Sequence, residues 1–215
     1  MASLIDRYDH ISFDLDGTLV HTIDTYRHAT TRRAVRDLGG SEPDETAMDR
    51  FWFEAGRNRI IEELFKLDPD VFWNHFHVID TIEGRGRETY AYEDAEPALH
   101  RIKDYNKQTS IITGAPSWIA EMEVGKLNKG PVDHYFSITS SEYAEKPDPA
   151  SFFHVLDVLK STPKQTLYVG NSNEDALFAH QAGVDFLYLE RRKHDFDLTD
   201  YAIATIHSLD QLFES

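Results

Sequence analysis

Short strand-like runs alternate with helical patterns along most of this chain, and that alternation limits its fold more than any other feature. The first run, residues 8–15, is rich in β-favouring side chains and ends in the turn Asp16-Gly17. The later strand-like runs cover residues 109–113, 135–139, 167–169, 186–189 and 201–205. Strands that alternate with helices of about ten to fifteen residues predict a parallel α/β sheet with helices on both faces.

Two of the intervening helices have clear sequence signals. Apolar residues recur at helical spacing over residues 96–105 and 152–159. Asp148-Pro149 predicts the start of the second helix, with Asp148 as the N-cap and Pro149 at the first helical position, and Ala115-Pro116 favours a similar start.

One long segment interrupts the alternation and shows helical periodicity without a convincing strand. Met48, Phe51 and Trp52 fall at i, i+3 and i+4, and Asp68-Pro69 begins a further helix. An all-helical block after the first strand is typical of a lid over a site rather than of a second sheet domain. The predicted domains are a core of residues 1–20 and 93–215 and an all-helical insert of residues 21–92.

This insert contains a cluster of Trp and Phe residues, and we expect them to form its core rather than a platform for substrate. They occupy positions 51–53, 65, 72–73 and 76. His75 and His77 do not share a helix face, so we do not expect a histidine metal site there. The run Gly84-Arg85-Gly86-Arg87 predicts a flexible return of the chain toward the core.

Composition excludes several classes of protein. The 215 residues include 22 Lys+Arg and 38 Asp+Glu, for a formal charge of −16. We therefore expect no nucleic acid and no membrane as partner, because both attract basic surfaces. No apolar run approaches the roughly 18 residues of a membrane span, and the N-terminus lacks the apolar region of a signal peptide, so we expect a soluble, cytoplasmic protein of unassigned oligomeric state. The absence of cysteine excludes disulfides and thiolate sites.

Two carboxylates follow the first strand in Phe13-Asp14-Leu15-Asp16-Gly17-Thr18-Leu19. Parallel α/β sheets bind ligands at the carboxyl ends of their strands. There one carboxylate can attack as a nucleophile while the other moves a proton, and a divalent cation relieves their repulsion. An Asp-Gly turn that merely closes a strand is the structural alternative, and the motif alone leaves both open.

Three further motifs follow in order along the chain. They are Ile111-Ile112-Thr113-Gly114, Lys146-Pro147-Asp148-Pro149 and Val169-Gly170-Asn171-Ser172-Asn173-Glu174-Asp175. Together with the first motif they resemble the four ordered motifs of the haloacid dehalogenase-like hydrolase superfamily, in its helical-cap group, and the resemblance runs through nearly the whole chain. It implies a Rossmann-like parallel sheet core, an inserted helical cap and cleavage of phosphate esters with Mg²⁺.

The resemblance also implies a role for each motif. Asp14 would be the nucleophile that forms an aspartyl-phosphate, and Asp16 the general acid that protonates the leaving oxygen and then activates water. Thr113 and the Gly114 N–H would bind phosphoryl oxygens, and Lys146 would neutralise charge between Asp14 and the phosphoryl group. Taken singly, Thr113 and Lys146 also suit an ordinary strand end and an exposed proline turn.

The metal site implied by the resemblance takes oxygens from Asp14, the Asp16 backbone carbonyl and Asn171. Asp175 completes this set, expected behind the ligands where it holds Lys146. Relatives usually have a carboxylate at the position of Asn171, so we expect the neutral amide to weaken Mg²⁺ binding. The alternative is that Asn171 only caps the helix that starts near Ser172.

The loop Gly56-Arg57-Asn58-Arg59 interrupts two predicted helices of the insert. It resembles the loop by which helical caps of this family select substrates. Arg57 and Arg59 are therefore candidates for binding an anionic or polyhydroxyl leaving group, although a solvated helix start explains either of them equally well.

These observations predict a Mg²⁺-dependent phosphatase that acts on a small phosphorylated metabolite. A sugar-phosphate mutase shares the cap and the motifs, so it stays open. Within the family that the chain resembles, dehalogenases lack the second aspartate of the first motif, so the presence of Asp16 disfavours a dehalogenase. Phosphonate-cleaving relatives need a cap lysine for a Schiff base, and Lys66, the only lysine of the insert, is badly placed for that role. The alternative from another class is a catalytically weakened protein that still binds phosphate or Mg²⁺.

Overall fold

The computed structural model describes residues 3–54, 56–128, 130–138, 144–191 and 197–214. The chain forms two compact units. The first, which we call the sheet unit, comprises Met1–His21 and Tyr90–Ser215, and the second, the helical unit, comprises Thr22–Thr89.

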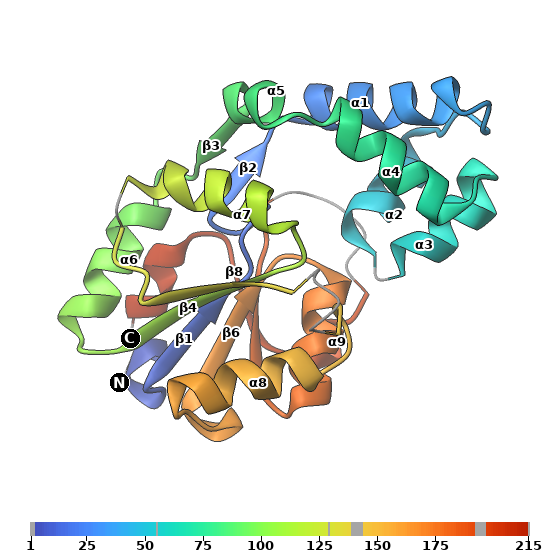
Figure 1. Ribbon diagram of the computed structural model, residues 1–215. Helices are drawn as coiled ribbons and strands as arrows, with labels where there is room; N and C mark the ends of the chain where they lie inside the picture. Colours follow the sequence, from blue (N-terminus) through green and yellow to red (C-terminus); the bar gives the residue numbers. More distant parts are fainter. Residues whose placement is uncertain (1–2, 55, 129, 139–143, 192–196, 215) are drawn as a thin grey trace. The chain divides into compact units, whose positions relative to one another are not determined.

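Six parallel strands form the main sheet, in the order β5-β4-β1-β6-β7-β8 (Figure 1). Each run predicted as a strand contributes one of them, although Thr139, predicted at the end of the third run, lies outside the described residues. The bounds are β1 His10–Phe13, β4 Gln108–Thr113, β5 His134–Ser137, β6 Thr166–Gly170, β7 Asp185–Leu189 and β8 Ala202–Ile206.

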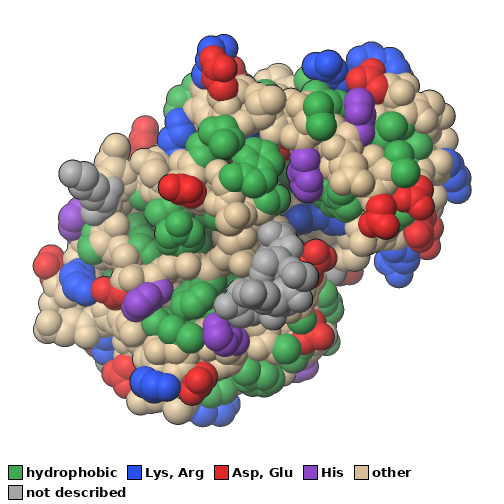
Figure 2. All heavy atoms as spheres, in the orientation of Figure 1, with side chains coloured by type: hydrophobic (Ala, Val, Ile, Leu, Met, Phe, Trp, Pro, Cys, Tyr) green, Lys and Arg blue, Asp and Glu red, His purple; other side chains and the backbone are tan. Residues whose placement is uncertain are grey.

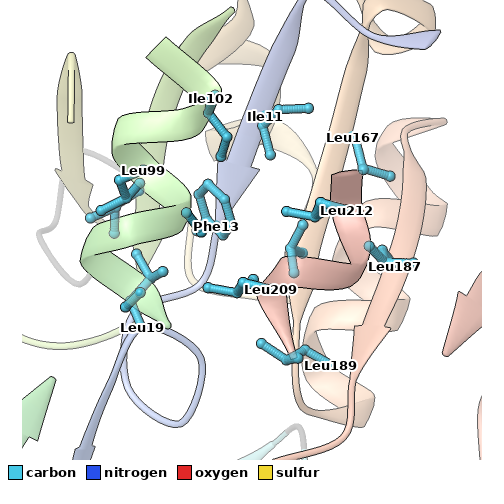
Figure 3. Close-up of a cluster of buried hydrophobic side chains, with 14 of the residues drawn as sticks. Ile11, Phe13, Leu19, Leu99, Ile102, Leu167, Leu187, Leu189, Leu209 and Leu212 are labelled. Atoms are coloured by element: carbon cyan, nitrogen blue, oxygen red, sulfur yellow. The ribbon is translucent and has the colours of Figure 1, made fainter. Parts of the chain in front are cut away.

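Helices cover both faces of this sheet, because successive side chains of a strand point to opposite faces and both sets are apolar. Leu167 and Val169 of β6 join one buried cluster, which Figure 3 shows between the strands, α6 and the C-terminal turn. Tyr168 joins the other, with side chains of α8 and α9. The predicted α/β class is thus confirmed. The helices of this unit are α6 Ala95–Asp104, α7 Ser117–Val124, α8 Ala150–Leu159 and α9 Asn173–Ala182, and the C-terminal turn is Leu209–Phe213.

Helix α8 begins one residue later than predicted. Pro149 occupies the N-cap, and the Asp148 carboxylate accepts the N–H of Ala150 at 2.9 Å. Asp148 thereby forms an Asx turn just before the N-cap residue Pro149. This turn explains why the sequence predicts Asp148 itself as the N-cap. Pro116 likewise occupies the N-cap of α7.

The described residues of the helical unit pack around aromatic side chains. Phe51, Phe65, Phe72 and Phe76 are buried together, with Trp52 and Trp73 partly buried against them, so the predicted aromatic core is confirmed for these residues. Phe53, also predicted, is buried but is not part of this cluster. Helix α4 begins as predicted, since the Asp68 carboxylate accepts the Val71 N–H at 3.0 Å. The elements are α1 Asp24–Asp37, α2 Glu45–Phe53, α3 Arg57–Ile60, a π-helical turn Ile61–Phe65, α4 Pro69–Ile79 and α5 Ile82–Arg87.

Two expectations about the insert are wrong. Residues 21–92 do take part in strands, because β2 (Val20–Thr22) pairs with β3 (Thr89–Ala91). Strands of three residues are too short to show a period of two in the sequence.

The run 84–87 is likewise not a flexible return but part of α5. Thr81 Oγ1 accepts the Gly84 N–H at 3.1 Å, and the buried Arg85 pairs with Asp80 at 3.1 Å. The Thr81 N-cap and the Arg85–Asp80 ion pair offset the low helix propensity of the two glycines.

Acidic and basic side chains are interspersed on the visible surface of the helical unit (Figure 2). Ion pairs of the helical unit include Arg32 with Glu45 at 2.7 Å and Arg33 with Asp37 at 3.5 Å. In the part of the chain that the structure describes, no helix has the length and apolar character needed to cross a membrane.

Candidate active site

The carboxyl ends of β1, β4 and β6 meet at one edge of the sheet, where the first, second and fourth motifs lie. Phe13, the last residue of β1, pairs with Ile111 of β4 and with Val169 of β6. The next residue, Asp14, donates its N–H to the Val169 carbonyl at 2.9 Å and is only 8% exposed. The fold therefore buries a carboxylate at the position where parallel sheets place their ligands.

Lys146, the third motif, reaches this edge from the segment before α8. Its Nζ donates to Asp14 Oδ1 at 2.8 Å and to Asp175 Oδ1 at 2.9 Å. The ring centroids of Tyr168 and Phe178 lie 5.4 Å and 5.7 Å from the same nitrogen. One buried ammonium group thus joins two carboxylates from different motifs, beside two aromatic rings that exclude water.

Hydrogen bonds occupy both oxygens of the Asp175 carboxylate. Oδ1 accepts from Lys146 and from the Tyr168 hydroxyl at 3.2 Å. Oδ2 accepts from the Ser172 hydroxyl at 2.7 Å and from the N–H groups of Asn171 and Ser172, each at 3.2 Å. These bonds fit the expectation that Asp175 holds Lys146, and they argue against Asp175 as a direct metal ligand, because little lone-pair capacity is left.

Asn171 presents its side chain to the first motif. Thr18 Oγ1 lies 3.3 Å from Asn171 Oδ1 and 3.3 Å from Asp14 Oδ2, so the two oxygens face one region. The N-cap of α9 is Ser172, whose hydroxyl accepts the Asp175 N–H at 3.1 Å. The alternative that Asn171 only caps this helix is therefore wrong.

Two glycines allow this close approach. Gly17 has φ of +90°, and a Cβ there would lie 2.4 Å from Asn171 Nδ2. A Cβ at Gly170 would lie 2.7 Å from the Cβ and Cγ of Asp175. A larger residue at Gly17 would push the first and fourth motifs apart, and one at Gly170 would displace Asp175 within the fourth motif.

Asp14, Lys146 and Asp175 shift one another's pKa values. Burial, followed by the neighbouring Asp175 carboxylate, raises the pKa of Asp14, although Lys146 opposes the shift. Burial would also raise the pKa of Asp175, but Lys146 and the hydrogen bonds from Ser172 and Asn171 hold it below its ordinary value. Burial alone would lower the pKa of Lys146, and the carboxylates of Asp14 and Asp175 raise it above its usual range. Of these two carboxylates, Asp14 is therefore the one whose negative charge is less well compensated.

These residues fit a small divalent cation. The Asp14 carboxylate and the Asn171 amide oxygen converge, and both are the hard oxygen donors that Mg²⁺ prefers. The raised pKa of Asp14 agrees with this fit, because a bound cation would add positive charge beside the buried carboxylate and favour its ionised form. Asp16 is half-buried and follows Asp14 by two residues in the same motif.

Thr113 ends β4, one residue beyond the partner level of Asp14. Its buried Oγ1 accepts the Ala115 N–H at 3.1 Å, which leaves its hydroxyl proton to donate. Gly114 follows on the same loop, and among the described residues other than its chain neighbours no heavy atom lies within 4 Å of the place where its Cβ would be. Both residues stand where an anion could meet a backbone N–H and a hydroxyl group.

Arg57 and Arg59 lie apart from these motifs in the chain, at the start of α3 in the helical unit. Gly56 precedes them with φ of +79°, and Arg59 is exposed with its Nε 3.9 Å from Glu63 Oε1.

Two contacts at this site have only weak signals in the sequence. Thr18 is part of the first motif, but its link between Asp14 and Asn171 depends on how the turn folds. Tyr168 reads as an ordinary strand residue, yet its buried hydroxyl bonds to Asp175. The one sequence signal for Tyr168 is a hydroxyl group on a strand that is otherwise fully buried, because such a group needs a hydrogen-bond partner.

Comparisons with known proteins agree with this geometry. A family model described as haloacid dehalogenase-like hydrolase matches residues 8–183. The chain is 29% identical over 196 residues to a phosphoglycolate phosphatase of Cereibacter sphaeroides, with 86% of each chain covered. It is 26% identical over 197 residues to a phosphoglycolate phosphatase of Psychrobacter arcticus, with 82% of this chain and 81% of the relative covered.

Among solved structures, a haloacid dehalogenase-like family hydrolase of Streptococcus pneumoniae superposes with a TM-score of 0.82 at 19% identity, covering 96% of this chain and 97% of that one. This likeness concerns the fold. The family model, by contrast, spans most of the sequence and includes all four motifs that meet around Asp14 and Lys146. The chain therefore belongs to the haloacid dehalogenase-like hydrolases.

Proposed function

We propose that the protein is a Mg²⁺-dependent phosphatase of small phosphate monoesters, with Asp14 as the nucleophile. The observation that carries this proposal is the buried Lys146 ammonium group between Asp14 and Asp175, beside the converging oxygens of Asp14 and Asn171. A carboxylate held by a cation on one side and open to a metal on the other suits attack on a dianionic phosphoryl group.

Two steps follow from this arrangement. A carboxylate oxygen of Asp14 forms a bond to phosphorus while the ester oxygen leaves and takes a proton from Asp16. Water then attacks the aspartyl-phosphate and gives a proton to Asp16, which releases phosphate and restores both carboxyl groups. Asp16 is less buried than Asp14, as a group that exchanges protons with the leaving group and water should be.

The other residues bind and orient the phosphoryl group. Lys146 offsets its negative charge next to Asp14, and the Thr113 hydroxyl and Gly114 N–H donate hydrogen bonds to its oxygens. Asp175 fixes Lys146 and the turn of Asn171 and Ser172. Mg²⁺, when bound, would neutralise the phosphoryl and Asp14 oxygens, held by Asp14, the Asp16 carbonyl and Asn171.

The helical unit is proposed as the cap that selects the leaving group. Its loop at Gly56 offers Arg57 and Arg59, whose charges suit an acidic leaving group. The two relatives named phosphoglycolate phosphatase point the same way. We therefore propose phosphate esters of small hydroxy acids as the first substrates to test, with phosphoglycolate among them.

A panel of phosphorylated metabolites, assayed for released phosphate with and without Mg²⁺, tests this function. We expect Mg²⁺-dependent release from at least one small ester, and loss of release in Asp14→Asn with the fold retained by circular dichroism. Interconversion of sugar phosphates with little net phosphate would indicate a mutase instead. No turnover of any ester at high Mg²⁺ would favour a phosphate-binding protein that is not an enzyme.

A further inference from the structure

Arg191, just after β7, makes four hydrogen bonds to two distant parts of the sheet unit. Its Nε and Nη2 donate to the Thr18 carbonyl at 3.3 Å and 3.0 Å. Its Nη1 and Nη2 donate to the two carboxylate oxygens of Asp94 at 2.8 Å and 2.7 Å. The side chains of Arg191 and Asp94 are only 8% and 13% exposed, so this is a largely desolvated, two-pronged ion pair.

Asp94 is itself anchored. It accepts from the Ser208 hydroxyl at 3.0 Å and from the Leu209 N–H at 2.8 Å. Burial alone would raise its pKa, but Arg191 and these hydrogen bonds hold the pKa of Asp94 below its ordinary value. The Tyr92 ring lies 4.1 Å below the guanidinium carbon of Arg191. Arg191 is therefore held in one orientation by groups outside the four motifs.

The other end of the contact is the turn that carries the nucleophile. The N–H groups of Thr18, Leu19 and Val20 all donate to the Leu15 carbonyl, so the turn is tightly wound. The Thr18 hydroxyl bonds to Asp14 Oδ2 and Asn171 Oδ1. Because the Thr18 carbonyl and hydroxyl belong to one residue, Arg191 acts on the position of Asp14 and Asn171 through Thr18.

We propose that Arg191 is a positioning residue for the turn of residues 14–20, which carries Asp14, and that Asp94 holds Arg191 in place. Thr18 precedes the point where the chain leaves the sheet unit, and Tyr92 and Asp94 follow the point where it returns. Arg191, just after β7, thus binds both the segment that leaves the sheet unit and the segment that returns to it. We call this pair of contacts the clamp. The role of Arg191 in catalysis rests on the proposed function, whereas the clamp itself is a property of the fold.

Arg101 is a chemically matched control. It pairs with Asp210 at 3.2 Å and lies 3.8 Å from the Phe213 ring centroid, so it repeats the arginine, carboxylate and aromatic ring away from the four motifs. This pair is more exposed, with side chains 45% and 58% accessible. Arg101→Gln should therefore leave both the turn and turnover unchanged.

Hydrogen–deuterium exchange tests the clamp without any assay of activity. In Arg191→Gln, amides of residues 14–20 should exchange at least about tenfold faster than in the wild type, because the tight turn opens more often. Arg191→Lys should show a smaller increase, since an ammonium group cannot bridge Thr18 and Asp94 in the same way. If Arg191→Gln fails to fold, Arg191→Lys and Asp94→Asn provide the same test. Unchanged exchange in folded variants would overturn the clamp.

Kinetics at saturating Mg²⁺ then test positioning. In folded variants kcat should fall about 10- to 100-fold while KM changes by less than about threefold, because displacement of the nucleophile affects the reaction more than binding. Faster exchange with an unchanged kcat would overturn the positioning role. If the wild type hydrolyses no ester, the proposed function fails, and exchange still decides whether the clamp exists.

Discussion

The two ends of strands β1, β4 and β6 are both polar and buried, but they differ in charge. At the carboxyl end, Lys146 joins Asp14 and Asp175. At the amino end, His10 bonds through Nε2 to Ser110 Oγ at 2.8 Å and through Nδ1 to Thr166 Oγ1 at 3.2 Å. The first cluster is ionic, whereas the second consists of neutral groups.

The difference shows where this fold buries charge. Burial is the main cause that lowers the pKa of His10 to about 4, with Asp133 opposing and His134 adding to the shift, so the imidazole is neutral at pH 7. A neutral polar group needs only hydrogen bonds to be tolerated, while a buried ion needs a counter-ion as well. Of the two ends of these strands, the structure accepts the larger cost at the carboxyl end, where chemistry is proposed.

The largest effect should come from removing the ammonium group. Lys146→Met leaves Asp14 and Asp175 as neighbouring buried carboxylates, so we expect about 3–5 kcal/mol loss of stability at pH 7 and no measurable turnover. Part of the stability should return as the pH falls and a carboxylate is protonated, because both groups then have raised pKa values. Urea unfolding at pH 7 and pH 5 measures this.

Lys103→Met is the matched control for that change. Lys103 pairs with Asp133 at 2.6 Å but is 52% exposed, so its loss should cost less than about 1 kcal/mol. Equal losses for the two lysine variants would mean that the buried pair has no special weight.

The next effect concerns the neutral end. The unfolded chain binds a proton at His10 near pH 6.5, but the folded chain does so only near pH 4. This contribution to stability is complete above about pH 6.5 and is lost as the pH falls toward 4. Wild type should therefore lose about 2 kcal/mol more than His10→Gln between pH 7 and pH 5.

Chemical unfolding of both proteins at the two pH values gives this difference directly. His100→Gln provides the comparison, because the His100 side chain is 59% exposed. Its pH dependence should follow the wild type. Parallel curves for wild type and His10→Gln would show that the buried imidazole does not resist protonation.

A smaller effect is expected at Asn171, where the charged end lacks an anion. Asn171→Asp should lower the half-saturating Mg²⁺ concentration about tenfold, or about 1.4 kcal/mol, because a carboxylate attracts the cation more strongly than an amide. The shift of the unfolding temperature with Mg²⁺ reports binding independently of turnover.

Asn173→Asp adds the same charge two residues further on and controls for the general field. If the two variants behave alike, Asn171 does not ligate the metal, and the missing charge must come from elsewhere.

The smallest effect belongs to the helical unit, where the proposed leaving-group contacts are more exposed than either strand end. Arg57→Ala or Arg59→Ala should raise KM for the best acidic ester about three- to tenfold, and KM for a small aryl phosphate less, because only the acid would meet the guanidinium group. Arg33→Ala, in an exposed pair with Asp37, should change neither value. Equal changes for both esters would count against the loop as the selector.

Most of the strands and the four motifs could be predicted because their signals are local. Apolar runs bounded by turn residues identify the sheet, and Asp14, Lys146 and Asn171 stand in short patterns with recognisable neighbours. Errors arose where the local signal was weak or misleading. Strands β2 and β3 have three residues each, too few to show a strand pattern. The two glycines of α5 favour a loop in the sequence, whereas the Asp80–Arg85 pair stabilises a helix.

The sequence by itself determined the fold class, the family and which carboxylates stand at the strand ends. Only the tertiary structure decided that Asp175 has its oxygens occupied, that Ser172 and not Asn171 caps α9, and that Arg191 reaches Thr18. Arg191 and Thr18 are 173 residues apart in the chain, and His10 and Ser110 are 100 apart. Contacts of this kind leave no periodic or local trace, because they depend on which strands the fold places side by side and on which polar groups that packing removes from water.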